Sequence, residues 1–431
     1  MKNSIGIKQL IIIFFMGLAY TIVYALPFVQ YVFYDDLQAA LSVSNAQLGT
    51  LITIFGIGNL LAPFGGALGD KFNTKKIYIF AMFVVSALNF LFVINMSSYT
   101  FALLIWGGFA LAGLFLFFPA HTKLVRLLGS EEQQGTIFGL TESACGITSV
   151  IVNAVALYFY AKFAIGALGG VNGLKAVIIS YGVIGVVSTV VLLFLIPNDI
   201  SEKEVISKAE LDTSKEDTKL TMQDWLNVLK DPRTWMSGFA VFSTYTMYVT
   251  LSYYTPYFTN VLGVTVVFSG GLAVLRTYGT RFIGSPIGGM IGDKIKSVST
   301  VVGVSLLAAA LIIIGFMTAP AGTSQTLLVA LTLIIGIFTY MARGSMFAVP
   351  SELKISRKYA ASTAGVVCAV GYCPDLFIFI LYGYWLDKFG NAGYTYIFIY
   401  AIVVLILGFL NSLLIRVYKR KHFSDAQGIE E

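Results

Sequence analysis

Long and largely uncharged hydrophobic segments follow one another along almost the whole chain, separated by short stretches of charged and turn residues. Each segment has about the 20 residues that a helix needs to cross the roughly 30 Å hydrocarbon core of a bilayer. We therefore predict transmembrane helices over residues 10–33, 46–68, 75–96, 100–120, 135–160, 174–196, 235–259, 266–290, 299–318, 326–349, 360–385 and 393–416. This pattern predicts an all-α integral membrane protein with twelve transmembrane helices.

One long polar segment divides these helices into two groups of six. It mixes lysine, glutamate, aspartate and serine and is neither apolar nor rich in glycine. We predict an N-terminal six-helix bundle over residues 1–196, a cytoplasmic central loop over 197–233 and a C-terminal six-helix bundle over 234–431. The first hydrophobic segment is too long for the core of a signal peptide and lacks a small-residue cleavage pattern, so we interpret it as the first transmembrane helix.

The composition agrees with a membrane protein. Of the 431 residues, 57% are hydrophobic and 12% are charged, and the mean hydropathy is +0.82. Soluble domains have about 45–50% apolar and 25% charged residues. The net charge of +6 does not indicate nucleic-acid binding, because the basic residues lie in short loops rather than on one domain face. The three cysteines lie in apolar segments without ligand-type spacing, so we expect neither a disulfide nor a metal site, and no cofactor.

The distribution of basic residues predicts the orientation in the membrane. With the N-terminus in the cytoplasm, the outer loops contain Lys162, Lys175 and Lys388. The inner short loops and tails then contain Lys2, Lys8, Lys71, Lys75, Lys76, Lys123, Arg126, Lys294, Lys296, Lys354, Arg357, Lys358, Arg416, Lys419, Arg420 and Lys421. Since basic residues accumulate in cytoplasmic loops, we expect a multi-pass protein of the cytoplasmic membrane with both termini inside.

Two sequence motifs occur once in each half of the chain. The sequence PFGGALGDK at residues 63–71 returns as PIGGMIGDK at residues 286–294, at the ends of the second and eighth predicted helices. A second repeat ends the fourth and tenth predicted helices and consists of Gly113, Pro119, Lys123 and Arg126, then Gly344, Pro350, Lys354 and Arg357. The halves are therefore duplicates in the same orientation, because six helices separate them.

The first repeat has the properties of a conformational latch. Its small residues let two helices approach closely in lipid, and an aspartate at a helix end can cap the helix or pair with a basic partner. We assign this role to Gly66, Asp70, Lys71, Gly289, Asp293 and Lys294. Together with Lys75 and Lys76, the first copy resembles the signature loop of the major facilitator superfamily, although Asn73 stands where that family usually has glycine. The resemblance covers essentially the whole chain and implies the major facilitator fold and a monomer.

Five ionisable residues lie inside predicted helices, where charges are rare and costly and therefore indicate function. Arg276 and Asp375 are predicted near mid-membrane, whereas Glu142, Arg281 and Arg343 lie nearer the cytoplasmic side. Three arginines against two carboxylates favour an anionic substrate, because the guanidinium fork suits carboxylate or phosphate groups. The alternative is structural, with Arg276 paired to Asp375 and Arg281 to Glu142.

The chain also resembles, more weakly, bacterial permeases for organic acids and sugar phosphates. An arginine in the eighth helix is similar to the substrate arginine of oxalate and nitrate permeases. The chain lacks the second-helix arginine of nitrate permeases and the eleventh-helix lysine of the oxalate carrier. This resemblance implies that Arg276 binds an anion, and Arg343 is a further candidate because it is another charge inside a predicted helix.

Tyrosines in the first and seventh helices are further candidates for the binding site, because the resemblance implies that these two helices line the cavity. Tyr24, Tyr253 and Tyr257 combine an apolar ring with a hydroxyl, as does the series of tyrosines that recurs along one face of the first helix. Packing or an interfacial position is the alternative. With Arg276, Arg343 and Asp375, these tyrosines complete the predicted substrate site. His121 is interpreted as a loop-edge residue rather than a proton relay.

These features together predict a secondary active transporter for a small anion, driven by a proton or counter-anion gradient. No nucleophile with a base, metal-ligand cluster or phosphate-binding loop supports an enzyme, and no segment has the length of an ATPase domain. Glu142 is the candidate group for proton coupling, and with Arg281 it is predicted to form a gate between the halves. The alternative is a metabolite sensor with the transporter fold that binds without transport.

Overall fold

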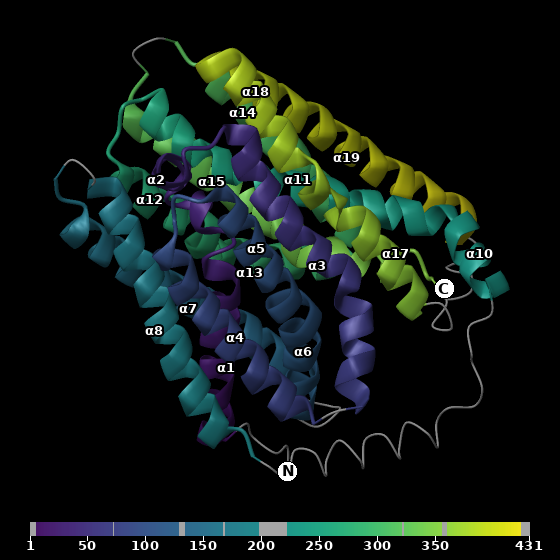
Figure 1. Ribbon diagram of the computed structural model, residues 1–431. Helices are drawn as coiled ribbons and strands as arrows, with labels where there is room; N and C mark the ends of the chain where they lie inside the picture. Colours follow the sequence, from purple (N-terminus) through teal and green to yellow (C-terminus); the bar gives the residue numbers. More distant parts are fainter. Residues whose placement is uncertain are drawn as a thin grey trace. The chain divides into compact units, whose positions relative to one another are not determined.

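The computed structural model describes residues 6–71, 73–128, 134–166, 169–197, 222–320, 323–355 and 360–423, and all regular structure in these ranges is helical. The chain separates into two compact units. The first comprises Met1–Glu216 with Val264–Val274, and the second comprises Asp217–Gly263 with Leu275–Glu431. Figure 1 gives the labels of the helices.

The first unit contains long helices interrupted by short turns of other helix types. Its elements are α1 (Ile7–Ala25), the 3₁₀ turn η1 (Val29–Tyr31), α2 (Tyr34–Leu41), α3 (Asn45–Lys71), α4 (Thr74–Ile94), α5 (Tyr99–Phe109), the π-helical η2 (Ala110–Phe117), α6 (Phe118–Leu127), α7 (Gln134–Phe163), α8 (Gly169–Leu195) and α12 (Val266–Val274).

The second unit is built in the same way. Its elements are α10 (Met222–Lys230), α11 (Pro232–Asn260), the π-helical η4 (Leu275–Gly279), α13 (Thr280–Lys294), α14 (Val298–Met317), α15 (Gln325–Ser345), η5 (Met346–Ala348), α16 (Val349–Glu352), α17 (Ala360–Tyr372), η7 (Cys373–Leu376), α18 (Ile378–Phe389), η8 (Gly390–Ala392) and α19 (Gly393–Phe423).

The predicted fold class is confirmed. Every predicted transmembrane segment overlaps with at least one helix of the structure. Within the described ranges, eight helical stretches are long and apolar enough to cross a membrane, or nine if Tyr34–Leu41 and Asn45–Asn59, which meet at 101°, form one span. The seventh predicted span, α11, falls outside this set because serine, threonine and tyrosine dilute its apolar residues.

The internal repeat of the sequence is also a repeat of helix packing. In the first unit α1 packs on α7, α3 on η2, and α4 on α8. In the second unit α11 packs on α17, α13 on α15, and α14 on α19. These pairs join equivalent helices of each half, namely the first with the fifth, the second with the fourth and the third with the sixth. The duplication inferred from two short motifs therefore extends through both bundles.

The helices are less continuous than the hydrophobic pattern suggests. A single helix over residues 10–33 was expected, but α1 ends at Ala25 and is followed by a 3₁₀ turn. Pro27 lacks the backbone N–H that would continue the helical hydrogen bonds, so this part of the prediction was wrong. The eleventh span is interrupted in the same way, because Pro374 lies in the 3₁₀ turn η7.

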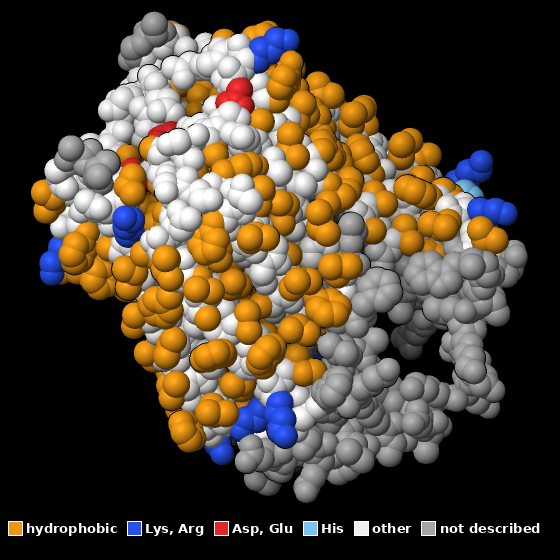
Figure 2. All heavy atoms as spheres, in the orientation of Figure 1, with side chains coloured by type: hydrophobic (Ala, Val, Ile, Leu, Met, Phe, Trp, Pro, Cys, Tyr) orange, Lys and Arg blue, Asp and Glu red, His pale blue; other side chains and the backbone are white. Residues whose placement is uncertain are grey.

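Hydrophobic side chains cover the outer faces of the long helices. In Figure 2 they lie along α8 and along α19, whereas lysine and arginine side chains lie near helix ends. Phe194 on α8 is 80% exposed and Leu414 on α19 is 57% exposed. Lipid is the natural solvent for such faces, and the polar groups of the backbone are satisfied within each helix.

Candidate substrate-binding site

Arg276 is the most buried charged side chain of the second unit among the described residues, with 0% exposure. It lies in the π-helical turn η4, which interrupts the eighth span. Its Nη2 donates a hydrogen bond of 2.9 Å to the Thr255 hydroxyl on α11, and its guanidinium lies 5.6 Å from the centre of the Tyr254 ring. Its Nε and Nη1 atoms are buried without a hydrogen-bond partner.

These contacts do not satisfy the charge of Arg276. A guanidinium has five N–H donors, and a buried charge without a counter-ion costs several kcal/mol. The alternative prediction that Arg276 pairs with Asp375 was wrong, because the contacts of Arg276 are with Thr255 and Tyr254. The unpaired donors of Arg276 therefore suit an incoming acceptor such as a carboxylate or phosphate oxygen.

Arg343 forms a second arginine centre in the same unit. Its guanidinium lies 4.1 Å from the centre of the Tyr248 ring and 5.7 Å from that of Tyr245, which are cation–π distances. Its Nη1 is buried without a hydrogen-bond partner. Arg343 lies about 13 Å along the helical stretch from Glu352, and its side chain points away from Glu352 because side chains lean toward a helix N-terminus.

Asp375 belongs to the neighbourhood of Arg343. The break η7 holds it in the middle of the eleventh span, where it is 4% exposed. The Tyr245 hydroxyl lies 2.9 Å from each of its carboxylate oxygens, to which it donates. Tyr245 therefore contacts both the carboxylate and the arginine, and it joins three residues from α11, α15 and η7 into one cluster.

The three predicted tyrosines have different surroundings. The Tyr253 hydroxyl donates to the Phe379 carbonyl at 3.3 Å, and its side chain is buried. Tyr257 lies 5.3 Å from Phe316 in an aromatic cluster of the second unit. In the first unit, Tyr24 packs against Tyr20 at a ring distance of 4.6 Å. Their role in substrate binding stays a prediction.

Sequence reasoning missed several polar partners in the second unit. On α11, Thr255 contacts Arg276, Tyr248 contacts Arg343, and Tyr245 contacts Asp375. On α15, Tyr340 packs against the Tyr248 ring. One signal was present in the sequence, because Tyr245, Tyr248, Ser252 and Thr255 recur every three or four residues. A polar stripe of this kind on a transmembrane helix faces protein or substrate rather than lipid.

The two residues predicted to act in coupling or gating lie in different units. Glu142 is on α7 of the first unit and Arg281 is on α13 of the second. Their pairing as a gate therefore stays a prediction.

His121 was wrongly interpreted as a loop-edge residue. It lies within α6, is 5% exposed, and its Nδ1 atom is 3.4 Å from the Tyr78 hydroxyl. The rings of Phe117 and Tyr20 lie 5.2 Å and 5.4 Å from the imidazole. A linear hydrophobic pattern does not show this burial, because Tyr20 and Tyr78 come from other helices, α1 and α4.

The repeated motif lies at the ends of α3 and α13. Gly66, Asp70 and Lys71 belong to the last turns of α3, and Gly289, Asp293 and Lys294 to the last turns of α13. The side chains of Asp70, Lys71 and Asp293 lie outside the described residues. Close approach of helices is present within the second copy, where a Cβ on Gly288 would lie 2.3 Å from the Met341 carbonyl oxygen of α15.

Two residues next to the first copy have defined roles. Asn73, which replaces the usual glycine, caps α4 because its side chain accepts a 3.1 Å hydrogen bond from the Lys76 backbone N–H. The Lys75 ammonium donates to the Ile196 carbonyl just after the end of α8, at 2.6 Å. A cation is favourable there because a helix C-terminus carries partial negative charge.

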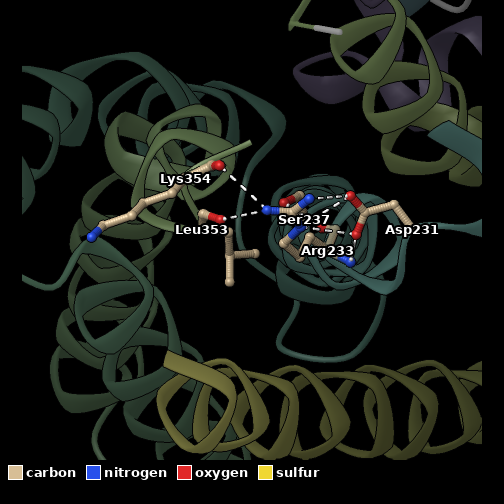
Figure 3. Close-up of polar contacts among 5 residues, drawn as sticks. All are labelled: Asp231, Arg233, Ser237, Leu353 and Lys354. Carbon is tan, nitrogen blue, oxygen red and sulfur yellow. Dashed lines mark hydrogen bonds and ion pairs between the residues drawn. The ribbon is translucent and has the colours of Figure 1, made fainter. Parts of the chain in front are cut away.

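At the start of α11, Arg233 contacts both a carboxylate and backbone carbonyl groups, as Figure 3 shows. It forms an ion pair of 2.7 Å with Asp231, and its Nη1 donates to the carbonyl oxygens of Leu353 and Lys354 at 3.4 Å and 3.3 Å. Arg233 precedes the hydrophobic segment predicted at 235–259, and its hydrogen bond to Asp231 raises the pKa of the guanidinium above its ordinary value.

Glu352 joins three helix ends of the second unit. Its carboxylate accepts hydrogen bonds from the Ser299 backbone N–H at 2.6 Å and from the Ser297 hydroxyl at 2.8 Å, and it forms an ion pair with Lys419. It thereby caps α14 and holds α19 beside α16. The hydrophobic pattern and the repeated motifs do not indicate this role of Glu352.

The family model described as the Major Facilitator Superfamily matches residues 10–373. The chain belongs to the major facilitator superfamily. This membership makes it a multi-pass membrane transporter, as the twelve helices in two repeats and the signature loop indicated.

The chain is similar to curated bacterial proteins over most of its length. Inner membrane protein YihN of Escherichia coli (strain K12) is 29% identical over 383 residues, which are 87% of this chain and 88% of YihN. Inner membrane protein YqcE of the same strain is 25% identical over 375 residues, 85% of each chain. These names place the relatives in the inner membrane.

Solved structures share the fold at low sequence identity. A bacterial homologue of the human lysosomal transporter Spinster, inward-facing and unoccupied, has a TM-score of 0.74 at 16% identity and covers 97% of this chain and 99% of its own. The xylose transporter XylE of E. coli, inward open, has a TM-score of 0.69 at 14% identity, covering 94% and 95%. At such identities the likeness establishes the fold alone.

Proposed function

We propose that this member of the superfamily is a secondary active transporter that moves a small anionic metabolite across the cytoplasmic membrane by alternating access. The proposal that the substrate is anionic rests on Arg276, a fully buried guanidinium whose Nε and Nη1 have no hydrogen-bond partner. A carboxylate or phosphate would supply both the missing acceptors and the missing charge. Uncharged substrates would leave that charge uncompensated.

The Arg343 cluster supports the same proposal. Arg343 also has a buried donor without a hydrogen-bond partner, and its face lies on Tyr248. Asp375 partly balances this second cation through Tyr245. We therefore assign primary anion binding to Arg276, and a supporting role to Arg343, Asp375, Tyr253, Tyr257 and Tyr24.

The remaining parts of the proposal concern energy and orientation. Transport is driven by a proton gradient or by exchange for a counter-anion, and the transporter works as a monomer with both termini in the cytoplasm. The N-terminal bundle 1–196, the central loop 197–233 and the C-terminal bundle 234–431 are the proposed functional divisions. The excess of lysine and arginine in the inner loops supports this orientation.

Glu142 and Arg281 are proposed to tie the two bundles together on the cytoplasmic side. Loss of one partner leaves an unpaired charge, so Glu142→Gln and Arg281→Gln should each slow transport. The double variant should slow transport by less than the sum of the two single effects, expressed as free energies. A double-mutant cycle on uptake rates measures this coupling. Additive effects would remove the gate from the proposal. If protons are coupled through Glu142, Glu142→Gln should also abolish the pH dependence of uptake.

Reconstitution decides the proposed function. The purified protein is placed in proteoliposomes and tested for uptake of radiolabelled inorganic phosphate, oxalate, a sugar phosphate, lactate and sulfate, with and without a pH gradient. Xylose and a nucleoside serve as neutral controls. We expect uptake of at least one anion and none of the neutral compounds. Uptake of a neutral compound alone would overturn the anionic assignment, and binding without uptake would indicate a sensor.

A further inference from the structure

The helical turn that carries Arg276 has an unusual backbone. Residues Leu275–Gly279 form the π-helical turn η4 between α12 and α13. Such turns are rare and contain one residue more than an α-helical turn. Since each residue of an α-helix rotates the chain by about 100°, gain or loss of this extra residue would change the direction of Arg276 relative to α13.

Helix α15 holds this turn at two places. The Tyr340 hydroxyl donates a hydrogen bond to the Thr277 carbonyl, directly after Arg276. One turn earlier, Gly336 lies against the Arg276 carbonyl, which a Cβ at residue 336 would approach to 2.9 Å. The same carbonyl accepts a 2.7 Å hydrogen bond from the Thr280 hydroxyl. All five residues that make these contacts are buried within the second unit.

Tyr340 also touches the second arginine centre. Its ring meets the Tyr248 ring edge to face, with centroids 6.3 Å apart, and the guanidinium of Arg343 lies on the Tyr248 ring. Tyr340 and Arg343 are three residues apart on α15 and therefore lie on the same side of that helix. A continuous series of contacts thus runs from the Arg276 turn through Tyr340 to Tyr248 and Arg343.

We propose that Tyr340 is a positioning residue for Arg276. Through the Thr277 carbonyl it holds the π-helical turn in the form that aims Arg276 beside Thr255, and it joins that turn to the Arg343 centre. This inference rests on the proposed anion binding at Arg276. It assigns a function to a hydroxyl that donates its hydrogen bond to the backbone of the turn and that the sequence pattern did not single out.

Tyr340→Phe tests the inference because it removes the hydroxyl and keeps the ring against Tyr248. The probe is the anion of the panel above that binds the purified wild-type protein with the highest affinity. We expect Tyr340→Phe to raise its Kd about 10-fold, the effect of one buried hydrogen bond. In an Arg276→Gln background, Tyr340→Phe should change the Kd by less than about 2-fold, because the turn then has no arginine to position.

Two further variants separate positioning from folding. Gly336→Ala places a methyl group against the Arg276 carbonyl and should also raise the Kd. Tyr78→Phe removes a buried hydroxyl that lies near His121 in the first unit, so it should lower the melting temperature without changing the Kd. If Tyr340→Phe does not fold, Gly336→Ala replaces it and is measured in the wild-type and Arg276→Gln backgrounds.

The outcomes distinguish the two proposals. If Arg276→Gln abolishes binding while Tyr340→Phe and Gly336→Ala leave it unchanged, the positioning role is overturned and the proposed function stands. An equal effect of Tyr340→Phe with and without Arg276 also overturns the positioning role. If no anion of the panel binds, or Arg276→Gln binds like the wild type, the assignment of Arg276 fails and the inference fails with it.

Discussion

Arg233 and Arg276 are both arginines of the second unit, but their guanidinium groups have opposite surroundings. Arg233 has an ion pair with Asp231 and hydrogen bonds to two carbonyl groups. Arg276 is more deeply buried, yet it has one hydrogen bond to Thr255 and two nitrogen atoms without a partner. The two arginines therefore differ in the number of hydrogen-bond donors that have a partner, and this difference is the basis of our proposal that Arg276 binds a ligand whereas Arg233 stabilises the fold.

The largest expected effect comes from replacing each of the two arginines, Arg276 and Arg233, by glutamine. Arg276→Gln should raise the Kd for the bound anion about 100-fold, because charge-assisted hydrogen bonds are lost. It should leave the melting temperature unchanged or higher, since an unpaired buried charge is removed. Arg233→Gln should do the reverse, with an unchanged Kd and a lower melting temperature. Binding assays and thermal unfolding in detergent measure both, and equal behaviour of the two variants would break the comparison.

Glu352 extends the comparison to a carboxylate that, like the Arg233 guanidinium, has several hydrogen-bond and ion-pair partners. Glu352→Gln should lower the free energy of unfolding by about 2 kcal/mol, because the hydrogen bonds from Ser299 and Ser297 weaken and the ion pair with Lys419 is lost. The Kd for the anion should not change. Lys419→Met is the matched control and should show part of the same loss of stability. If the Glu352→Gln variant instead bound the anion more weakly without losing stability, Glu352 would have a role in binding, as proposed for Arg276, rather than a structural role like that of Arg233.

The repeated aspartates test whether residues at helix ends act on motion rather than on binding. Asp70→Asn and Asp293→Asn should each slow turnover about 10-fold while the Kd stays within about 2-fold, if the aspartates stabilise one access state through helix ends and basic partners. Uptake rates in proteoliposomes and equilibrium binding in detergent provide the two quantities. A large change in Kd with normal turnover would contradict the latch.

The smallest effect is expected for Arg233→Lys. Lysine keeps the charge beside Asp231 but cannot make the forked set of hydrogen bonds, and the pair is partly exposed, with side-chain exposures of 26% and 21%. The free energy of unfolding should fall by less than about 1 kcal/mol, and the loss should shrink at high salt. The corresponding Arg276→Lys should weaken anion binding strongly. A lysine tolerated equally at both positions would show that the forked geometry is unimportant at Arg276.

The sequence by itself determined the fold and the family. Twelve apolar segments, the position of the polar central segment and the two repeated motifs are local properties of the chain, and lipid gives the chain few alternatives to helices. The sequence also located Arg276, Arg343 and Asp375, because a charge inside an apolar segment is visible without any structure.

The tertiary structure decided the partners of these charges. Thr255 is 21 residues from Arg276, Tyr340 is 63 residues from Thr277, and Tyr245 is 130 residues from Asp375. The hydrophobic pattern reports which residues leave water, but hydrogen bonds between helices depend on how the helices rotate and pack. For this reason the buried position of His121, the π-helical turn at Arg276 and the unpaired donors of Arg276 came from the structure alone.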